Sequence, residues 1–330
     1  MSIRISALAL ALAAVALGGR TAGAATYYVN CATHDGLNTI GAAVRAAKAS
    51  ELREPATINV TGACRENVQI TDIDRLTLNG LHGASVTDAS NGAIETIGVY
   101  RGTGITIAGL TVNGGADAIS VGGASVVLSA ITAQGAVSDG VGVYPGGFVF
   151  INVATLQNNG YAGLLVFGGD ANAAGVTTQG NAEGIVVDRG GRMQFRVTDP
   201  FYEGGSASVP AVVTRNSDFG ILAQNNSEAK CLSCAITSNA SGGVSLDMGS
   251  NAVFGRYYLA SGVAEAPLTI TGNGGPGIII GDLSSAAMPF SAGAGLVQGN
   301  GGAFQIACNS ATSATRRALL FASGVTNCVN

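Results

Sequence analysis

A solenoid of short β-strands is the fold class that the sequence predicts, and three observations predict it. A strand–Asn–Gly–strand phrase recurs along the 330 residues, at 157–166, 179–187, 215–222, 238–244 and 272–280. The glycines that open the strands follow one another at steps of 23, 21, 36, 23, 34 and 25 residues. Segments such as Ile105-Thr106-Ile107 alternate apolar and polar side chains. A coil of about 22 residues is too short for helix-pair repeats and suits three strands, which predicts an all-β parallel β-helix of about ten coils from Val68 to Ile306.

Asparagines and glycines recur at fixed places in this phrase. Asn tolerates the left-handed backbone of a tight turn, and its amide can bond to the next Asn in a stack. The 50 glycines fit turns and close contacts between coils. We therefore interpret both columns as scaffold. The asparagines are Asn159, Asn181, Asn216, Asn239, Asn273 and Asn300, and the anchor glycines are Gly140, Gly163, Gly184, Gly220, Gly243, Gly277 and Gly302.

Residues 1–24 are typical of a secretory signal peptide. Arg4 precedes an apolar stretch from Ile5 to Leu17, and Ala22-Gly23-Ala24 provides small residues for cleavage. The stretch is too short to span a bilayer. We expect a secreted or periplasmic chain, cleaved near Ala24, with no membrane span in the mature part.

Three regions should follow the signal. Residues 25–66 should form an N-terminal cap with a helix over 37–49, where Leu37, Ile40, Ala43, Val44 and Ala47 have helical spacing. Residues 67–307 should form the coil, with long loops at 196–210 and 255–267. Residues 308–330 should form a C-terminal cap, in which 313–322 is a candidate helix.

Six cysteines in an exported chain predict disulfides. Proximity along the chain favours Cys31–Cys64, Cys231–Cys234 and Cys308–Cys328, of which the first and last would fasten the two caps. Composition bounds the partners: charged residues are 11% and the net charge is −4, so no basic surface for nucleic acid is present. The acidic balance disfavours polyanions unless a cation bridges them. No cofactor is indicated; calcium stays open, and the ligands of any metal are unknown.

The two long loops mark a candidate site. Each follows a similar phrase, so both should leave the coil at one corner, two coils apart, and in repeat proteins such insertions collect on the binding face. They contain Tyr202, Tyr257 and Tyr258. Four residues after the anchor glycines, a column places Asp188 and Asp247 on either side of Gln224, roughly 9–10 Å apart.

This separation is close to that of the two carboxyl groups in inverting glycosidases. Asp188 and Asp247 are therefore the candidate catalytic residues. Arg189 and Arg192 could hold a substrate carboxylate, Gln224 and the loop tyrosines could contact a sugar, and the alternative is that the two carboxylates only bond turn amides.

The phrase from Gly104 to Gly114 resembles those of the right-handed parallel β-helix superfamily, which includes pectate lyases and polygalacturonases. The resemblance covers nearly all of the mature chain and implies a right-handed coil whose N-terminal opening is plugged by a short helix. No specific enzyme motif of the superfamily is matched. The Asn-Thr-Asp and Gly-His-Gly motifs of polygalacturonases are absent, and Arg196 with Asp199-Pro200 lacks the second Arg of the pectate lyase segment.

Two functions remain from these observations. The first is a secreted β-helix that binds extracellular polysaccharide in a groove beside the long loops, with cleavage by hydrolysis or elimination left open. The second is a non-catalytic structural or adhesive surface protein whose partner is a cell-surface component. The fold alone does not separate them, because this scaffold carries unrelated functions.

Overall fold

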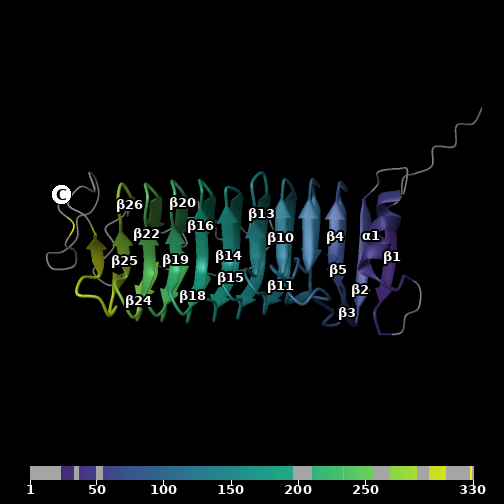
Figure 1. Ribbon diagram of the computed structural model, residues 1–330, viewed down its shortest axis with the longest axis horizontal. Coiled ribbons are helices and arrows are strands. Elements are labelled where there is room, and N and C mark those ends of the chain that lie inside the picture. Colours follow the sequence, from purple (N-terminus) through teal and green to yellow (C-terminus); the bar gives the residue numbers. More distant parts are fainter. Residues whose placement is uncertain are drawn as a thin grey trace, which may run out of the picture.

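The structure is a computed structural model that describes residues 24–32, 37–49, 55–195, 210–232, 234–255, 268–287, 297–309 and 328. Figure 1 shows strands stacked along one long axis, with the purple helix α1 and strand β1 at one end and the yellow C-terminal strands at the other. The predicted signal peptide and the predicted C-terminal helix lie outside the described residues. Within the described ranges, no helix is both long and apolar enough to span a bilayer.

One side of the coil is a sheet of ten parallel strands, here called the third face, which runs in the order β28-β25-β22-β19-β16-β14-β12-β10-β7-β4. It gives one strand to each coil, so the prediction of about ten coils is confirmed. The strands are β4 (Val68–Thr71), β7 (Ile97–Tyr100), β10 (Ile119–Gly122), β12 (Val141–Val143), β14 (Ala162–Phe167), β16 (Glu183–Asp188), β19 (Phe219–Ala223), β22 (Gly242–Leu246), β25 (Ile278–Ile280) and β28 (Ile306–Cys308).

The remaining strands pair into one 18-stranded parallel sheet that supplies the other two faces. The first face contains β1 (Ala25–Asn30), β2 (Ala56–Thr61), β5 (Leu76–Gly80), β8 (Ile105–Ala108), the first halves of β11 (Ser125–Gln134), β13 (Phe148–Gln157) and β15 (Asp170–Gln179), then β17 (Arg192–Phe195), β20 (Glu228–Leu232), β23 (Asn251–Gly255) and β26 (Ser285–Ala287). The second face contains β3 (Ala63–Arg65), β6 (Ser85–Thr87), β9 (Thr111–Asn113), the second halves of β11, β13 and β15, then β18 (Ala211–Thr214), β21 (Cys234–Thr237), β24 (Thr269–Thr271) and β27 (Val297–Gln298).

The two faces meet at a bend made by a single left-handed residue. Ala130, Val153 and Gly175 have φ values of 50°, 54° and 62° and occupy equivalent places in β11, β13 and β15. The sequence predicts three separate short strands per coil, but these three coils have two faces in one ten-residue strand. The reason is that one left-handed residue turns the chain without breaking the ladder on either side.

The core follows from the period-two alternation. In β5 and β8, Leu76, Leu78, Ile105 and Ile107 point inward and are fully buried, while the intervening threonines stay partly exposed. Each fully buried aliphatic side chain contributes about 1.5–3 kcal/mol of transfer free energy, so the stacked columns of Ile, Leu and Val are the main stabilising element.

The asparagine column is a continuous buried ladder. Each side-chain Nδ2 donates to the Oδ1 of the next Asn at 2.8–3.2 Å, and Asn300 completes the chain by donating to Gln305 Oε1 at 2.9 Å. The anchor glycines leave room for this ladder: a Cβ at Gly140 would lie 2.7 Å from Asn159 Nδ2 and 2.7 Å from the Gly163 carbonyl oxygen. The scaffold interpretation of both columns is confirmed.

The N-terminal end is closed by α1 (Ile40–Ala49), which buries Ile40, Ala43, Val44 and Ala47 as the helical spacing predicts. The helix begins at Ile40 and not at Leu37, because Leu37 forms a bridge with Val29. Glu66 accepts hydrogen bonds from the backbone amides of Ile40 and Gly41 at 2.7 and 3.0 Å. A carboxylate at this helix N-terminus satisfies free amides and complements the helix dipole.

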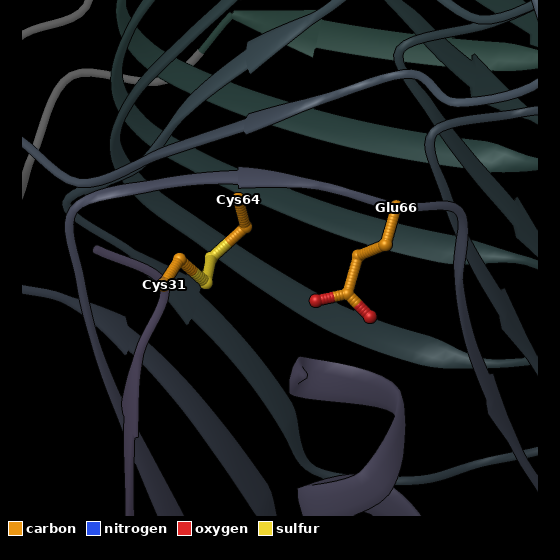
Figure 2. A group of neighbouring side chains, drawn as sticks. All are labelled: Cys31, Cys64 and Glu66. Carbon is orange, nitrogen blue, oxygen red and sulfur yellow. A yellow bond between two sulfur atoms is a disulfide. The ribbon is translucent and has the colours of Figure 1, made fainter. Parts of the chain in front are cut away.

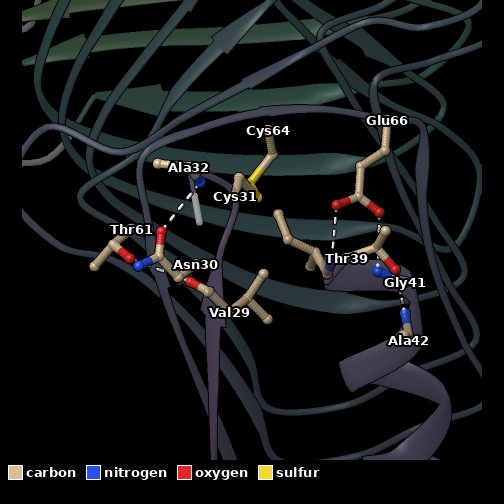
Figure 3. Close-up of a disulfide and its surroundings, with 11 residues drawn as sticks. Val29, Asn30, Cys31, Ala32, Thr39, Gly41, Ala42, Thr61, Cys64 and Glu66 are labelled. Carbon is tan, nitrogen blue, oxygen red and sulfur yellow. Dashed lines mark hydrogen bonds between the residues drawn. A yellow bond between two sulfur atoms is a disulfide. The ribbon is translucent and has the colours of Figure 1, made fainter. Parts of the chain in front are cut away.

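All three predicted disulfides are present. Cys31, which directly follows β1, is joined to Cys64 of β3 beside α1 (Figures 2 and 3), with 5.1 Å between the Cα atoms. Cys308–Cys328 joins β28 to the C-terminal segment, and Cys231–Cys234 closes the bend between β20 and β21. The first and last therefore fasten the chain at the two ends of the stack, where a solenoid exposes its edges.

Candidate functional site

The predicted column of Asp188, Gln224 and Asp247 lies at the end of the third face. Phe167 pairs with Asp188, and the pairs Val187–Ala223 and Ala223–Leu246 carry the same register through Gln224 to Asp247. The two carboxylates are therefore two coils apart, roughly 9–10 Å for strands at their usual spacing. The register deduced from the anchor glycines places these residues as expected.

Both carboxylates bond turn amides. Asp188 Oδ1 accepts from the Arg189 backbone amide at 2.6 Å and from Asn225 Nδ2 at 2.7 Å, and Asp247 Oδ1 accepts from the Met248 amide at 2.8 Å. These bonds have the form of the structural alternative that the sequence left open. A catalytic role for the pair stays a prediction.

Arg189 and Arg192 lie on different faces. The Arg189 guanidinium lies 4.7 Å from the centre of the Phe167 ring, in a cation–π contact at the edge of the third face. Arg192 opens β17 on the first face, where its strand neighbours are Asp170 and Glu228. The structure therefore does not bring the two arginines together as one clamp.

The loop tyrosines Tyr202, Tyr257 and Tyr258 lie outside the described residues. Before the loops, the described chain ends at Phe195 of β17 and at Gly255 of β23, both on the first face. After the loops it continues into β18 and β24, both on the second face. The register Phe195–Cys231–Phe254 puts the two exits two coils apart at one corner, with the Cys231–Cys234 bend between them. The Asp188 column lies at the opposite edge of the first face, where the third face ends.

A second group of polar residues lies at the start of the strands of the third face. Each of four coils has one acid at the same position, two residues before the first buried aliphatic residue of β7, β10, β12 or β16. These acids are Glu95, Asp117, Asp139 and Glu183. Ala162 occupies the same place in β14, between Asp139 and Glu183. The sequence contains a signal for this column, because Asp139 and Glu183 directly precede anchor glycines. Counting four positions after the glycines leads to the Asp188 column instead, so the sequence analysis does not predict this one.

Asp117 is the centre of a hydrogen-bonded group. Its Oδ2 accepts from Ser120 Oγ and from Tyr144 Oη, both at 2.7 Å. Its Oδ1 accepts from the backbone amide of Asp139 at 3.3 Å, and the Asp139 carboxylate in turn accepts from the Ala162 amide at 3.1 Å and from Ser138 Oγ at 2.9 Å. Two carboxylates on adjacent coils are thus buried side by side.

Burial changes the acidity of this column. Burial, and then the charge of Asp117, raise the pKa of Asp139 to about 7. Burial and the charge of Asp218 raise the pKa of Glu183 to about 7. Glu95 differs: burial raises its pKa, but hydrogen bonds from Gln69 and Tyr100 outweigh burial and hold the pKa below the ordinary value. Near neutral pH the column therefore holds both ionised and protonated carboxyl groups.

Two tyrosines fold back over glycines to reach these acids. A Cβ at Gly98 would lie 2.7 Å from Tyr100 Cε2, and a Cβ at Gly142 would lie 2.7 Å from Tyr144 Cε2. The missing side chains let each ring lie along its strand and let its hydroxyl reach Glu95 or Asp117. Burial raises the pKa of Tyr144, so that its hydroxyl stays a donor.

Apolar side chains complete this surface. Ala162, Leu165 and Val186 form a small cluster outside the coil, and Tyr144, Phe167 and Leu222 pack against it. The rings of Tyr144 and Phe167 are 6.4 Å apart, in an inclined arrangement. We call the part of the third face that contains these acids and rings the carboxylate–tyrosine face; its residues are Glu95, Tyr100, Asp117, Asp139, Tyr144, Phe167 and Glu183.

Side chains that could together bind a metal ion meet at one place in the described part of the chain. They are Cys31, Cys64 and Glu66 (Figure 2). The two sulfur atoms are joined in a disulfide and both Glu66 oxygens accept helix amides, so this group is already used for structure. Calcium binding stays a prediction.

Comparisons with known proteins give structural likeness at low identity. No protein-family model matches the chain, and no curated protein sequence matches it. The A-module of Azotobacter vinelandii mannuronan C-5 epimerase AlgE4 is similar over 83% of this chain and 87% of its own, with 13% identity and a TM-score of 0.43. The AlgE6 A-module is similar over 78% of this chain and 72% of its own, with 10% identity and a TM-score of 0.37. A GH87 alpha-1,3-glucanase catalytic domain in complex with nigerose is similar over 78% of this chain and 62% of its own, with 11% identity and a TM-score of 0.22.

Proposed function

We propose that the protein binds an extracellular polysaccharide through the carboxylate–tyrosine face. The observation that carries this proposal is the gathering of aromatic rings and carboxyl groups on adjoining coils of one sheet face. Glu95 is the partly exposed acid of the column and can accept from sugar hydroxyls, and the flat rings offer apolar surface to the C–H faces of a sugar. The three disulfides agree with an oxidising, extracellular location.

The stacking of equivalent positions along the long axis supports a polymeric ligand. The strands stack along the long axis (Figure 1), so each coil presents the same positions again after about 4.8 Å. A polysaccharide lying along this axis would meet Tyr100, Tyr144 and Phe167 in turn. Tyr100 ends β7, Tyr144 directly follows β12 and Phe167 ends β14. The three residues lie in one register column.

The proposal is tested with the secreted protein on a glycan array, followed by calorimetry with the oligosaccharide that binds. Tyr144→Ala should weaken binding at least about tenfold, because it removes both a ring and the donor to Asp117. Tyr28→Ala is the matched control, since Tyr28 is 69% exposed on β1, away from this face. If Tyr144→Ala binds with unchanged affinity and melts at the wild-type temperature, the carboxylate–tyrosine face does not bind the polysaccharide.

Cleavage is a second proposal, favoured by the observed register of Asp188 and Asp247. If the two carboxylates act as acid and base, Asp188→Asn and Asp247→Asn should each abolish the release of reducing ends from the bound polysaccharide while binding persists. Release that continues in the double variant would contradict hydrolysis at this column. If the polysaccharide binds but no reducing ends are released, with or without calcium, the protein binds the polysaccharide and does not cleave it.

A structural or adhesive role is favoured by the second face, whose strands from β6 to β27 carry no charged residue. Four threonines lie in register there: Thr111, Thr132, Thr155 and Thr177. Beside them runs a side-chain ladder in which Gln179 donates to Gln157, Gln157 to Gln134 and Gln134 to Asn113, at 2.8–2.9 Å. A protein that adheres through this face would keep its attachment to cells in Tyr144→Ala. Loss of attachment in that variant would assign it to the carboxylate–tyrosine face.

A further inference from the structure

The second face presents two columns of uncharged polar side chains that run in register through four coils. In each of these coils a threonine and, two residues later, a side-chain amide point outward, while the residue between them is buried. The first column is Thr111, Thr132, Thr155 and Thr177, and the second is Asn113, Gln134, Gln157 and Gln179. Strands at their usual spacing set these groups on a grid of about 4.8 Å along the long axis and about 6.6 Å across it.

Both columns keep unused hydrogen-bonding capacity. Gln179 donates to Gln157, and Gln157 donates to Gln134, and each of these bonds uses one N–H and one acceptor lone pair. A side-chain amide has two of each, so a glutamine inside the ladder still offers one donor and one acceptor outward. Within the described part of the chain, the threonine hydroxyls of the first column make no hydrogen bond. The ladder therefore fixes the side chains and leaves groups that a second polar surface can meet.

Charge favours the second face over the other two for contact between copies of this chain. The net charge is −4, the third face holds the acidic column, and the first face has charged residues on β15, β17 and β20. The strands of the second face from β6 to β27 carry no charged residue. Two copies can therefore meet through this face with the least repulsion and without removing water from a charged group.

We infer that the second face binds the second face of another copy of this chain, in a two-fold dimer whose long axes are parallel. A two-fold axis that lies between the two faces and runs along the stack (Figure 1) brings each coil against the same coil of the other copy and exchanges the two columns. Thr155 then lies opposite Gln157 of the other copy, so hydroxyls meet amides in every coil. An antiparallel pair would instead set each column against itself. Sheets that pair face to face gain in a similar way from stacked amide ladders.

The size of this contact predicts a weak dimer. The strands from β6 to β24 span seven steps along the stack. At about 4.8 Å a step and a width of about 10 Å, the footprint is roughly 340 Å² on each copy. Standard interfaces bury about 800 Å² on each partner. The dissociation constant should therefore be about 10–100 µM.

Sedimentation equilibrium of the whole secreted protein, from about 5 to about 500 µM, tests the contact by the rise of the mean mass toward that of a dimer. Thr155→Lys should weaken the dimer at least about tenfold, because the two-fold axis brings both new charges into one small uncharged contact. Thr132→Val keeps the shape and removes a hydroxyl, so it should weaken the dimer about three- to tenfold, and it gives an independent result if Thr155→Lys does not fold. Thr106→Lys is the matched control, since Thr106 is a partly exposed, outward threonine of β8 on the first face, and it should keep the wild-type constant.

A distance measurement tests the parallel arrangement. All six cysteines are in disulfides, so Gln298→Cys provides one site for a nitroxide label, on β27 one step beyond the contact. In the parallel dimer the two labels lie on the same coil and should be within about 20 Å of each other. In an antiparallel dimer centred on the same strands they would be about nine steps apart, or roughly 43 Å.

The outcomes do not depend on the proposed function. Tyr144→Ala, on the third face, should dimerise as the wild type does, whether or not a glycan binds. A protein that stays monomeric at the highest concentration would overturn the inference, and so would wild-type association in both Thr155→Lys and Thr132→Val. Weakening by Thr106→Lys in equal measure would place the contact on another face, and labels roughly 43 Å apart would overturn the parallel arrangement.

Discussion

The acidic column predicts an unusual dependence of stability on pH. Asp139 is 1% exposed and Glu183 is 5% exposed, and both have a pKa of about 7 in place of the ordinary 3.8 and 4.5. A carboxyl group whose pKa is raised by folding binds a proton more tightly in the folded state. Its contribution to stability is present below the ordinary pKa and is lost as the pH rises through the folded pKa. Raising the pH from 5 to 8 should therefore destabilise the protein.

The magnitude follows from the window between the two pKa values. Above pH 5 the unfolded carboxyls are ionised, while the folded ones keep their protons until about pH 7, a span of about two pH units. At 1.36 kcal/mol per unit, each carboxyl should lower the free energy of unfolding by about 2.5 kcal/mol between pH 5 and pH 8. For Asp139 the proton belongs to the pair with Asp117, so the change reports on both carboxyls together.

Asp88 lowers the stability at the acidic end of the pH range. Hydrogen bonds from Asn67, Ser90 and Gly92 outweigh burial and hold the pKa of Asp88 below its ordinary value. Its stabilising contribution is present above the ordinary pKa of 3.8 and is lost as the pH falls below it. The two effects together place the stability maximum at about pH 4, close to the ordinary pKa values of these carboxyls.

The assay is guanidinium denaturation followed by far-UV circular dichroism at pH 5, 6, 7 and 8. Asp139→Asn should remove about half of the decrease, because the amide still accepts from the Ala162 amide but cannot ionise. Asp170→Asn, on the first face, should keep the wild-type slope. A wild-type stability that is constant or rises from pH 5 to pH 8 would refute the assignment of protonated carboxyls to this column.

Three further predictions concern the scaffold. Asn216→Ala should lower the free energy of unfolding by about 2–4 kcal/mol in urea titrations, because it leaves buried ladder groups on both neighbouring coils without partners; a loss below about 0.5 kcal/mol would contradict a cooperative ladder. Val153→Gly should raise stability by about 1 kcal/mol, since Val153 has a φ of 54° and is 50% exposed, whereas Gly175→Val at the equivalent bend should lower it; equal signs for the two would refute the strain argument. Replacing both Cys31 and Cys64 by Ser should cost about 3–4 kcal/mol, read from the thermal midpoint with and without reductant; an unchanged midpoint would show that α1 holds the cap unaided.

The coil could be predicted from the sequence because its determinants are local. A tight turn that favours Asn, a glycine that must pass close to the ladder and a period-two strand lie within about ten residues of one another, and they recur. The first and last strands of the third face begin at Val68 and Ile306, as the phrase predicted. The bend at Val153 could not be predicted in the same way, because a β-branched residue gives no local signal for a left-handed backbone.

The site was only half predictable, for a related reason. Register arithmetic places Asp188 and Asp247 in one column because it needs nothing beyond a constant coil length. It cannot show that Tyr144 turns back over Gly142 to reach Asp117, a residue 27 positions earlier. The burial of Asp139 depends on side chains from neighbouring coils, and burial is what raises its pKa.

The two edges of the third face therefore differ in chemistry although both carry carboxylates. At the end of the strands, Asp188 and Asp247 bond the amides of their own turns, so their position is fixed by local backbone geometry. At the start, Asp117 and Asp139 lie against each other on adjacent coils, and the charge of one opposes the ionisation of the other. Proton exchange near neutral pH is accordingly expected at the start of the strands, where the two carboxyls repel each other.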